Sequence, residues 1–403
     1  MTHRMVIFML ASALMLGSAR GQMSHKHVSE AACETVALRC ASKVTPAFGR
    51  DGTLWLAWMA GGQVSVASSK DGGRTFSIPA QVTQGTLKLD LGPDARPKIA
   101  LDRKGDIAVA FSTFRDKAFN GEVFYSRSDD GGKTFAAPRP ITDNIESQRF
   151  EALGFDPHGA LFAAWLDKRN RVPVQKAGKK YDGAALFFAT STDDGASYSR
   201  ARMAVDNTCE CCRFGFAFDR SGHPVMVFRK IFEGGIRDHA IVTFDDQGAP
   251  GEVYRVSEDD WQISACPHQG PGLSIGPDGT YHVVWYTNGR VRKGLFYAQS
   301  RDGGKTFSQP MPIGQPGKSP SRPYVISGSP TTAIVWKEFD GEKTSVSLIT
   351  SADAGKTWSQ PRIIAVTSDS SDHPLLVSSG RQTYLSWMTK ADGYHLQPIE
   401  NEP

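Results

Sequence analysis

Along the chain, seven short runs alternate apolar residues with small or polar ones, and each run ends on an aromatic residue. Alternation with a period of two is typical of a strand that is buried on one face. The runs read DGTLWLAW, KGDIAVAF, HGALFAAW, SGHPVMVF, DGTYHVVW, PTTAIVW and RQTYLSW. The closing aromatics, 51 to 63 residues apart, are Trp58, Phe111, Trp165, Phe228, Trp285, Trp336 and Trp387. Seven units of this length predict an all-β propeller of four-stranded blades.

A second motif follows five of these runs and has the form Ser-x-Asp-x-Gly-x-x-aromatic. Its copies begin at Ser69, Ser128, Ser191, Ser300 and Ser351. The motif predicts a tight turn between two strands, in which the Asp caps backbone N–H groups, the Gly takes a positive φ and the aromatic packs back onto the sheet. In the fourth unit the motif is degenerate, with Phe244 in the place of the serine.

The two ends of the repeat array indicate how the ring closes. The seventh unit ends after about three strands, at the sequence YHLQPI. The stretch ETVALRC, residues 34–40, precedes the first unit and is a candidate for the missing strand. Such a strand would cover the edges that an open array exposes. We therefore predict one domain over residues 22–403, with seven blades and closure by an N-terminal strand; six blades are the alternative.

Residues 1–21 predict a signal peptide. The positively charged start MTHRM precedes the twelve-residue apolar run VIFMLASALMLG, and small residues follow at positions 19 and 21. The run is too short to span a membrane, so we expect an exported protein, periplasmic or secreted, in an oxidising compartment. The net charge of +4 gives no support for a nucleic-acid partner. We expect a monomer without a membrane span.

The repeated turn is the Asp-box, and together with the unit length and the export signal it makes the chain resemble the sialidase (neuraminidase) superfamily, also called BNR-repeat proteins. The resemblance covers nearly all of the chain after residue 21. It implies the fold more specifically than an activity, because Asp-boxes are structural turns in many propellers. Sialidases have six blades, so seven units depart from their pattern. Units four and five, with CECCRF and DDWQISACPHQGPGL, are also similar to a group of bacterial exported sialidase-like proteins.

Candidate ligand-binding residues lie in the segments that lead into the first strand of each unit. In a propeller these segments share one face with the loops between second and third strands, and ligands bind there near the axis. The candidates are Arg96, Arg149, Arg213, Arg322 and His373, with Arg237 from a second-to-third-strand loop. Guanidinium groups bind carboxylates in a bidentate fork, so the set predicts a site for an acidic glycan or another carboxylate. The alternative is pairing with nearby acids such as Asp94, Glu146 and Glu210.

The resemblance to sialidases also implies a catalytic set. These enzymes hold the sugar carboxylate with three arginines and use a Tyr–Glu pair as nucleophile and an Asp as acid. The candidates near the predicted mouth are Tyr324, Glu151, Asp116 and Asp238, and none sits in a diagnostic motif. The usual Arg-Ile-Pro motif appears only as ARPKI and SRPYV. A non-catalytic propeller that binds a ligand or a protein is therefore the alternative to an exo-α-sialidase-like hydrolase.

Three of the six cysteines fall within four positions, just before the first strand of unit four: Cys209, Cys211 and Cys212. Cys266 precedes the first strand of unit five, and adjacent blades place the starts of these strands side by side. In an oxidising compartment we expect one disulfide between the two units, with Cys266 as a partner.

The remaining cysteines leave two interpretations. Cys33 and Cys40 would pair separately, and two thiols of the CECC stretch would be left over. Those two either form a strained pair between neighbours or join His268 in holding a soft metal such as copper(I), which thiolate selects. No cofactor is otherwise required, and the second interpretation makes the same mouth a metal or redox site.

Overall fold

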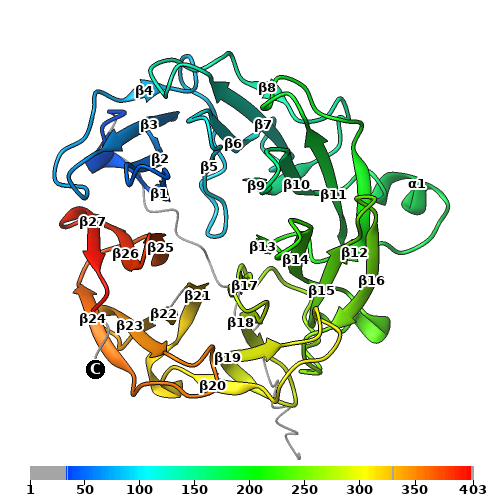
Figure 1. Cartoon of the computed structure of the whole chain (residues 1–403). Coiled ribbons are helices and arrows are strands. Elements are labelled where there is room, and N and C mark those ends of the chain that lie inside the picture. The colour runs from blue at the N-terminus through cyan, green and yellow to red at the C-terminus, as the bar shows by residue number, and fades with distance from the viewer. Residues whose placement is uncertain (1–32, 34, 329–330, 401–403) are drawn as a thin grey trace, which may run out of the picture. The chain divides into compact units, whose positions relative to one another are not determined.

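The computed structural model describes residues 33, 35–328 and 331–400, which form a ring of seven antiparallel sheets (Figure 1). The sheets follow one another in chain order, and the first strand of each lies nearest the axis. The first strand, β1 (Lys43–Phe48), contacts β25 (Leu375–Ser379) of the last sheet, so the two ends of the array are adjacent. The prediction of a seven-bladed, almost entirely β propeller is confirmed.

The first three blades follow the predicted units. Blade 1 contains β1, β2 (Leu54–Ala60), β3 (Gln63–Ser69) and β4 (Ala80–Gln81). Blade 2 contains β5 (Lys98–Leu101), β6 (Ile107–Phe114), β7 (Gly121–Ser128) and β8 (Arg139–Pro140). Blade 3 contains β9 (Gln148–Phe155), β10 (Leu161–Asp167), β11 (Ala184–Ser191) and β12 (Arg202–Thr208). The lysine-rich loop between β10 and β11 carries α1 (Arg171–Lys176), which has no buried residue and is a solvated insertion.

The remaining blades repeat the same order. Blade 4 contains β13 (Gly215–Phe218), β14 (Pro224–Arg229), η2 (Glu233–Gly235), β15 (His239–Phe244) and β16 (Pro250–Arg255). Blade 5 contains β17 (Gly272–Ile275), β18 (Tyr281–Asn288), β19 (Lys293–Ser300) and β20 (Met311–Ile313). Blade 6 follows η3 (Pro316–Lys318) and contains β21 (Ser321–Ser327), β22 (Thr332–Phe339), β23 (Thr344–Ser351) and β24 (Arg362–Thr367). Blade 7 contains β25, β26 (Gln382–Thr389) and β27 (Gly393–Pro398).

The seven aromatic residues that end the alternating runs all lie in the second strand of their blades. Their exposed fractions range from 0 to 3%. Each second strand is hydrogen-bonded on both sides within its sheet, and its two faces meet the neighbouring blades. The aromatic therefore packs at a blade–blade interface, which explains why it recurs once in every unit.

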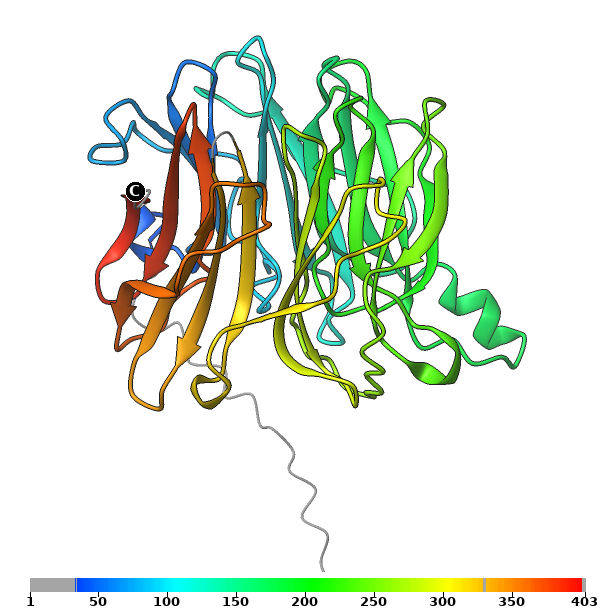
Figure 2. The ribbon, with the colours of Figure 1, turned by 60° about the horizontal axis from the view of Figure 1, so that its bottom comes forward.

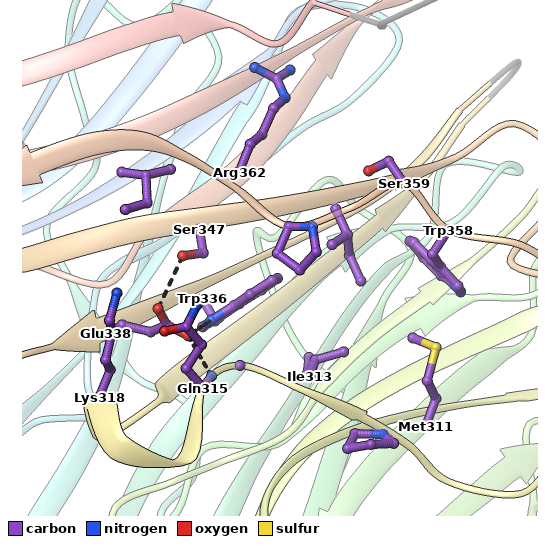
Figure 3. A pocket seen from close by; sticks show the side chains of 15 residues that line it. Met311, Ile313, Gln315, Lys318, Trp336, Glu338, Ser347, Trp358, Ser359 and Arg362 are labelled. Carbon is purple, nitrogen blue, oxygen red and sulfur yellow. Dashed lines mark hydrogen bonds between the residues drawn. The ribbon is translucent and has the colours of Figure 1, made fainter.

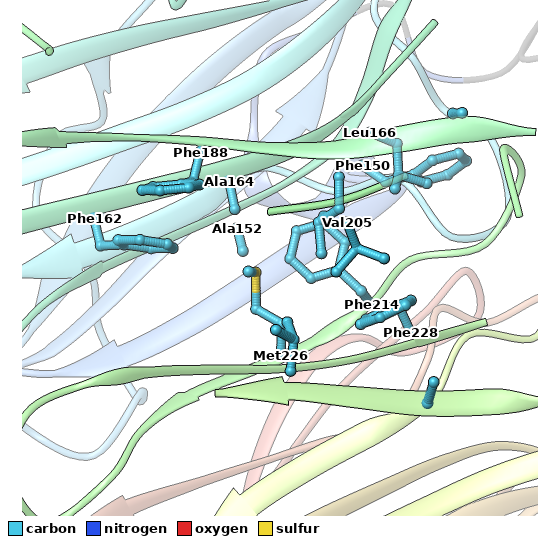
Figure 4. Close-up of a cluster of buried hydrophobic side chains, with 14 of the residues drawn as sticks. Phe150, Ala152, Phe162, Ala164, Leu166, Phe188, Val205, Phe214, Met226 and Phe228 are labelled. Atoms are coloured by element: carbon cyan, nitrogen blue, oxygen red, sulfur yellow. The ribbon is translucent and has the colours of Figure 1, made fainter. Parts of the chain in front are cut away.

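The apolar cluster between blades 3 and 4 shows how neighbouring blades hold together (Figure 4). Phe162 stacks on Phe188 of its own blade with ring centroids 5.5 Å apart, and on Phe216 of blade 4 at 5.4 Å. Met226 and Phe228 of β14 complete the layer. Each such side chain contributes roughly 1.5–3 kcal/mol when it is withdrawn from water, so a continuous apolar layer at each interface stabilises the ring.

The Asp-box turns have the predicted contacts and lie at the end of the third strand in five of the blades. In blade 1, the Ser69 hydroxyl donates to Asp71 at 2.8 Å and accepts from the Gly73 N–H at 2.8 Å. The Asp71 carboxylate also accepts from the Thr75 N–H at 2.9 Å. Gly73 has φ +85°, a conformation that other residues adopt only with strain. The turn is thus a local scaffold on the face opposite the predicted mouth.

The N-terminal stretch does not form the expected strand. Residues 35–41 contain the 3-10 helix η1 (Leu38–Cys40), which contacts β27 and β2, and the sheet of blade 7 has three strands among the described residues. The reason is the disulfide between Cys33 and Cys40, whose Cα atoms are 5.3 Å apart. A strand of this length would separate them by about 23 Å. The stretch still joins the first and last blades, because Trp58 Nε1 donates to Val36 O at 2.8 Å.

Two further predictions concern the signal peptide and the absence of a membrane span. Residues 1–21, the predicted signal peptide, lie outside the described residues. Within the described part of the chain, no helix is long and apolar enough to cross a membrane.

Candidate functional site

The predicted mouth lies on the face where segments lead into the first strands, which is also the face that carries α1 (Figure 2). At its centre is a set of charged side chains that we call the inner ion network. Its basic members are Lys43, Arg96, Lys98, Arg149, Arg213, Arg322 and Lys337. Its acidic members are Asp90, Asp94, Glu151 and Asp372. The four arginines predicted for the mouth therefore all lie in it.

Asp94 is the hub of this network. Its buried carboxylate accepts from Arg213 Nη1 at 2.8 Å and from Arg322 Nη1 at 2.7 Å. It also accepts from the backbone N–H of Arg213 at 3.2 Å and of Gly270 at 3.0 Å. Gly270 is needed there, because a Cβ at this position would lie 2.3 Å from the Arg213 backbone oxygen. Arg322 holds a left-handed φ of 55°, so its segment bends to make this contact.

Asp372 organises the side of the network near blades 1, 2 and 7. Arg96 Nη2 donates to its carboxylate at 2.9 Å, and Lys43 Nζ lies 3.5 Å from the same oxygen. Lys337 Nζ donates to the Ser371 hydroxyl at 2.7 Å, and no carboxylate of the described residues lies within ion-pair distance of it. Burial lowers the pKa of Lys337 to about 8. This lysine thus carries a positive charge that no acid side chain neutralises directly.

The fourth arginine of the mouth, Arg149, is also paired with an acid, and two of the acids expected as partners have other contacts. Arg149 Nε donates to Asp90 at 2.6 Å. Pairing of the arginines with acids is thus observed, and Asp94 is one of the acids expected. Glu210 instead pairs with Lys168 at 2.8 Å, and the Glu146 backbone oxygen, not its carboxylate, accepts from Arg115.

His373 lies among the arginines without carrying charge. It is buried, and burial lowers its pKa well below the usual value, with the positive charges of Arg322, Arg96 and Arg213 acting in the same direction. An imidazole in this position is neutral at pH 7. The positive charges of all three arginines therefore act on this imidazole.

Two of the candidate catalytic side chains lie in the network without contacting each other. Glu151 is buried, which raises its pKa, while the positive charge of Lys98 and a hydrogen bond from the Ser112 hydroxyl act in the opposite direction. Burial raises the pKa of Tyr324, although Arg96 and Arg213 oppose this. Among the residues that the structure describes, no carboxylate contacts the Tyr324 hydroxyl, so no activating Tyr–Glu pair is assembled.

The two candidate acids are engaged in holding loops. Asp116, on the loop between β6 and β7, accepts from the Asn120 amide at 2.7 Å and the Ala118 N–H at 2.8 Å, and these contacts lower its pKa. Asp238 accepts from three successive backbone N–H groups, those of residues 259–261, at 3.0 to 3.2 Å. Burial raises the pKa of Asp238. Asp116 thus caps its own loop, whereas Asp238 holds the β14–β15 loop against the segment that leads from blade 4 to blade 5.

The four cysteines of units four and five come together, and we call them the thiol cluster: Cys209, Cys211, Cys212 and Cys266. Cys209 Sγ lies 3.6 Å from Cys211 Sγ and 4.0 Å from Cys212 Sγ, and Cys266 lies close enough to Cys211 to shift the pKa of its thiol. The expectation that Cys266 reaches the CECC stretch is confirmed. All four are free thiols in the structure, so the expected disulfide between the two units is not formed there, whereas the separate Cys33–Cys40 pair is.

Arginines flank the thiol cluster. Arg237 Nη1 donates to Cys209 Sγ at 3.5 Å. Arg229 is fully buried and its charge helps to lower the pKa of Cys209, after the hydrogen bonds from Cys211 and Cys212. Arg237, predicted as a ligand-binding residue, thus lies with the thiols. His268 is partly buried beside them with a left-handed φ of 48°, and its Nδ1 has no hydrogen-bond partner in the described structure.

Sequence reasoning missed Lys98 and Lys337, and it treated Asp94 only as a competing partner. Burial lowers the pKa of Lys98 to about 8, and the nearby Arg96 and Arg213 act in the same direction. The sequence did contain part of the information that would have identified these lysines. Lys98 is two residues after Arg96 in the ARPKI segment, and Lys337 directly follows the closing Trp336 of unit six. Nothing in the sequence indicates that Asp94 reaches across the axis.

Two cavities lie away from this chemistry. One, of about 270 Å³, is formed by blade 6 and the end of blade 5; its carboxylate, Glu338, accepts from the Gln315 N–H, Trp336 Nε1 and the Ser347 hydroxyl (Figure 3). The other, of about 800 Å³, is lined by the turns between first and second strands, including Arg50 and Asp102. The first is lined in part by β20 and β24, the outermost strands of their blades, and the second lies on the Asp-box face, so neither cavity is the predicted mouth.

Comparisons with known proteins support the architecture. No family model matches the sequence, and no curated protein matches it. Among solved structures, a protein of unknown function from Dyadobacter fermentans is 15% identical with a TM-score of 0.54, over 79% of this chain and 95% of that one. A Hadza microbial sialidase is 14% identical with a TM-score of 0.53, over 90% and 74%. An ulvan lyase is 9% identical with a TM-score of 0.57, over 89% and 92%. At these identities the likeness shows the propeller fold alone.

Proposed function

We propose that this propeller binds an acidic glycan at the axial mouth. The observation that supports the proposal is the charge balance of the inner ion network, in which seven basic side chains accompany four carboxylates. Three positive charges are therefore unmatched in a partly buried region. A ligand carboxylate or sulfate that enters the mouth would provide the missing negative charge, and charge-assisted hydrogen bonds are the strongest that such a site offers.

The proposal is one of binding rather than hydrolysis. Tyr324 has a raised pKa and, among the described residues, no carboxylate partner, while Asp116 and Asp238 are occupied in holding loop segments. A retaining sialidase mechanism needs an activated Tyr and a free acid at one reaction centre. The arginines that would hold a sugar carboxylate are themselves engaged by Asp90, Asp94 and Asp372.

The names of the structural neighbours are compatible with this class of ligand. They include sialidases and ulvan lyases, and one lyase structure holds the disaccharide GlcA(1-4)Rha3S, which contains a carboxylate and a sulfate. Those activities belong to the neighbours. For this chain they motivate the choice of ligands to test.

The decisive experiment is calorimetric titration with a sialyl oligosaccharide, a uronate-containing oligosaccharide and their neutral counterparts at pH 7. We expect binding of an acidic sugar and none of its neutral counterpart. The Lys337→Met variant removes a positive charge without leaving a carboxylate unpaired, and we expect at least tenfold weaker binding, because a hydrogen bond to a charged group contributes about 1.5–3 kcal/mol. Lys104→Met, on the opposite face and 71% exposed, is the matched control and should bind as the wild type does.

Three results would count against the proposal. They are no binding of any acidic sugar at millimolar concentration, equal binding of acidic and neutral sugars, and unchanged affinity of Lys337→Met. An assay with a fluorogenic sialoside distinguishes binding alone from hydrolysis. Release of the fluorophore at a rate that falls in Tyr324→Phe would show that the site hydrolyses its ligand, contrary to the binding-only proposal.

A further inference from the structure

We propose that the thiol cluster binds one copper(I) ion, a function beyond glycan recognition. Three of its members, Cys209, Cys211 and Cys212, are buried, and their sulfur atoms all lie within 4.8 Å of one another. Cys266, from the segment that leads into the neighbouring blade, adds a fourth sulfur near Cys211 and outside the buried group of three. Four thiols from two blades thus meet at one place, which a purely structural core does not require.

The distances between the sulfur atoms match those expected around a thiolate-bound metal ion. Metal–sulfur bonds in thiolate sites are about 2.3 Å long, so sulfurs around a trigonal or tetrahedral centre lie roughly 3.8–4.0 Å apart. Cys209 Sγ is 3.6 Å from Cys211 Sγ and 4.0 Å from Cys212 Sγ. A metal ion can therefore be accommodated with small side-chain adjustments.

The surroundings carry the charge that a thiolate site needs. Arg237 donates from Nη1 to Cys209 Sγ at 3.5 Å, and Arg229 is buried nearby. Neither guanidinium forms an ion pair with a carboxylate in the described part of the chain, and the Nε atoms of both are buried without a hydrogen-bond acceptor. Because the two guanidinium cations lack acid partners, thiolates in the cluster would supply the negative charge that a carboxylate usually supplies to a buried arginine.

Backbone contacts hold the segments of the site together. The Cys209 N–H donates to Arg229 O at 2.7 Å, and the Arg237 N–H donates to Trp261 O at 2.8 Å. Ile236 and Gln262 form an isolated β-bridge. The three loops that carry the thiols and the arginines are therefore fixed to one another, which is the support that a metal site requires.

The chemistry of the ligands favours copper(I). Soft thiolates select copper(I), zinc or iron–sulfur clusters, and structural zinc sites are closed sites with four ligands. Three sulfurs lie in one buried group, and the fourth is exposed at the rim, where it can receive an ion from solvent. His268 lies close enough to Cys212 for the thiol to affect its pKa, and within the described structure its Nδ1 has no hydrogen-bond partner. Each thiol that binds the ion releases its proton to solvent, and no change of oxidation state is involved.

The test uses the full chain, reduced and kept without oxygen, and titrated with copper(I) in competition with a chromogenic copper(I) chelator. We expect one ion per chain and copper–sulfur distances near 2.3 Å by X-ray absorption. Cys209→Ser should abolish stoichiometric binding. Cys266→Ser changes an exposed residue and should leave the fold intact while weakening copper(I) binding at least tenfold.

The matched control is the Cys33→Ser, Cys40→Ser double variant, which also removes two sulfurs but should bind one ion. Equal copper(I) uptake by the wild type and Cys266→Ser, or uptake that disappears only in the control, would overturn the proposal. Tighter binding of zinc than of copper(I) would overturn the choice of metal. Failure of the reduced wild type to bind copper(I), with Cys266 found in a disulfide in protein purified from the periplasm, would make the cluster a structural cross-link. None of these results depends on whether the mouth binds a glycan.

Discussion

Asp94 and Arg322 are 228 residues apart in the sequence, yet Arg322 Nη1 donates to the Asp94 carboxylate at 2.7 Å. Asp94 comes from the segment before blade 2, and Arg322 lies at the start of blade 6. The same carboxylate holds Arg213 from the segment before blade 4 at 2.8 Å. One buried carboxylate therefore connects three blades that are not neighbours in the ring.

Replacing this carboxylate should destabilise the whole ring. In Asp94→Asn, two arginines whose side chains are only 11% and 16% exposed lose their shared counter-charge. Removing one partner of a buried ion pair costs roughly 3–5 kcal/mol, and we expect a loss of this size in the free energy of unfolding measured in urea. Asp182→Asn, in the exposed pair with Lys180, is the control and should change stability by less than about 1 kcal/mol. Similar losses in the two variants would show that Asp94 does not bridge the blades.

Buried histidines should make the fold sensitive to acid. Burial lowers the pKa of His282 from 6.5 to about 4, and the pKa values of His239 and His373 are lowered too. Between pH 6.5 and 4 the unfolded chain binds a proton that folded His282 does not, so stability falls as the pH falls through this window. The shift in His282 corresponds to about 3 kcal/mol.

The variant His282→Asn isolates this effect. It loses the hydrogen bond to the Tyr297 hydroxyl, 2.8 Å from Nδ1, which should lower stability by about 1 kcal/mol at every pH. Its urea midpoint should then decline less steeply than that of the wild type between pH 6.5 and 4. Parallel curves would mean that His282 does not contribute to the acid sensitivity.

The Asp-box serine should be worth more than an exposed serine in the same turn. The Ser351 hydroxyl accepts from the Gly355 N–H at 2.8 Å and is buried, so Ser351→Ala leaves a buried N–H without an acceptor. We expect a loss of about 1–3 kcal/mol in the free energy of unfolding. Ser359→Ala removes an exposed hydroxyl that accepts from the Thr350 N–H at 3.0 Å and should stay within about 0.5 kcal/mol of the wild type. Equal effects would show that the box does not depend on its buried serine.

The fold could be predicted from the sequence because its determinants are local and repeated. Each closing aromatic, such as Trp58 or Trp285, occupies the same place in its blade, and each Asp-box is satisfied by contacts within five residues. The N-terminal stretch was predicted incorrectly because its alternating pattern competes with a disulfide. Joining Cys33 to Cys40 forces a compact loop with the 3-10 helix η1, whatever the strand propensity of the residues between them.

The site could be predicted only in part, because its decisive contacts are long-range. The convergence of Arg96, Arg213 and Arg322 follows from their equivalent positions in different blades. Their pairing depends on Asp94 and Asp372, and nothing in a linear sequence says which carboxylate will reach across the axis. The meeting of Cys266 with the CECC stretch was predictable because it involves adjacent blades. The buried lysines were missed because their importance comes from burial and from neighbours on other blades.

Ligand binding at the mouth should weaken as the pH rises through 8. Burial lowers the pKa values of Lys98 and Lys337 to about 8, so both are charged below this pH and lose their positive charge above it. Affinity for an anion should therefore fall as the pH rises, because protonated lysines attract the anion and deprotonation removes two of the three unmatched positive charges. If an acidic sugar binds there, its dissociation constant measured by calorimetry should be nearly constant from pH 6 to 7 and should increase at least tenfold from pH 7 to 9.

In the Lys98→Met, Lys337→Met double variant, affinity should be weaker at pH 7 and nearly independent of pH, because the remaining arginines stay charged throughout this range. A wild-type affinity that does not change between pH 7 and 9, or a double variant with the same pH profile as the wild type, would place the ligand away from these lysines.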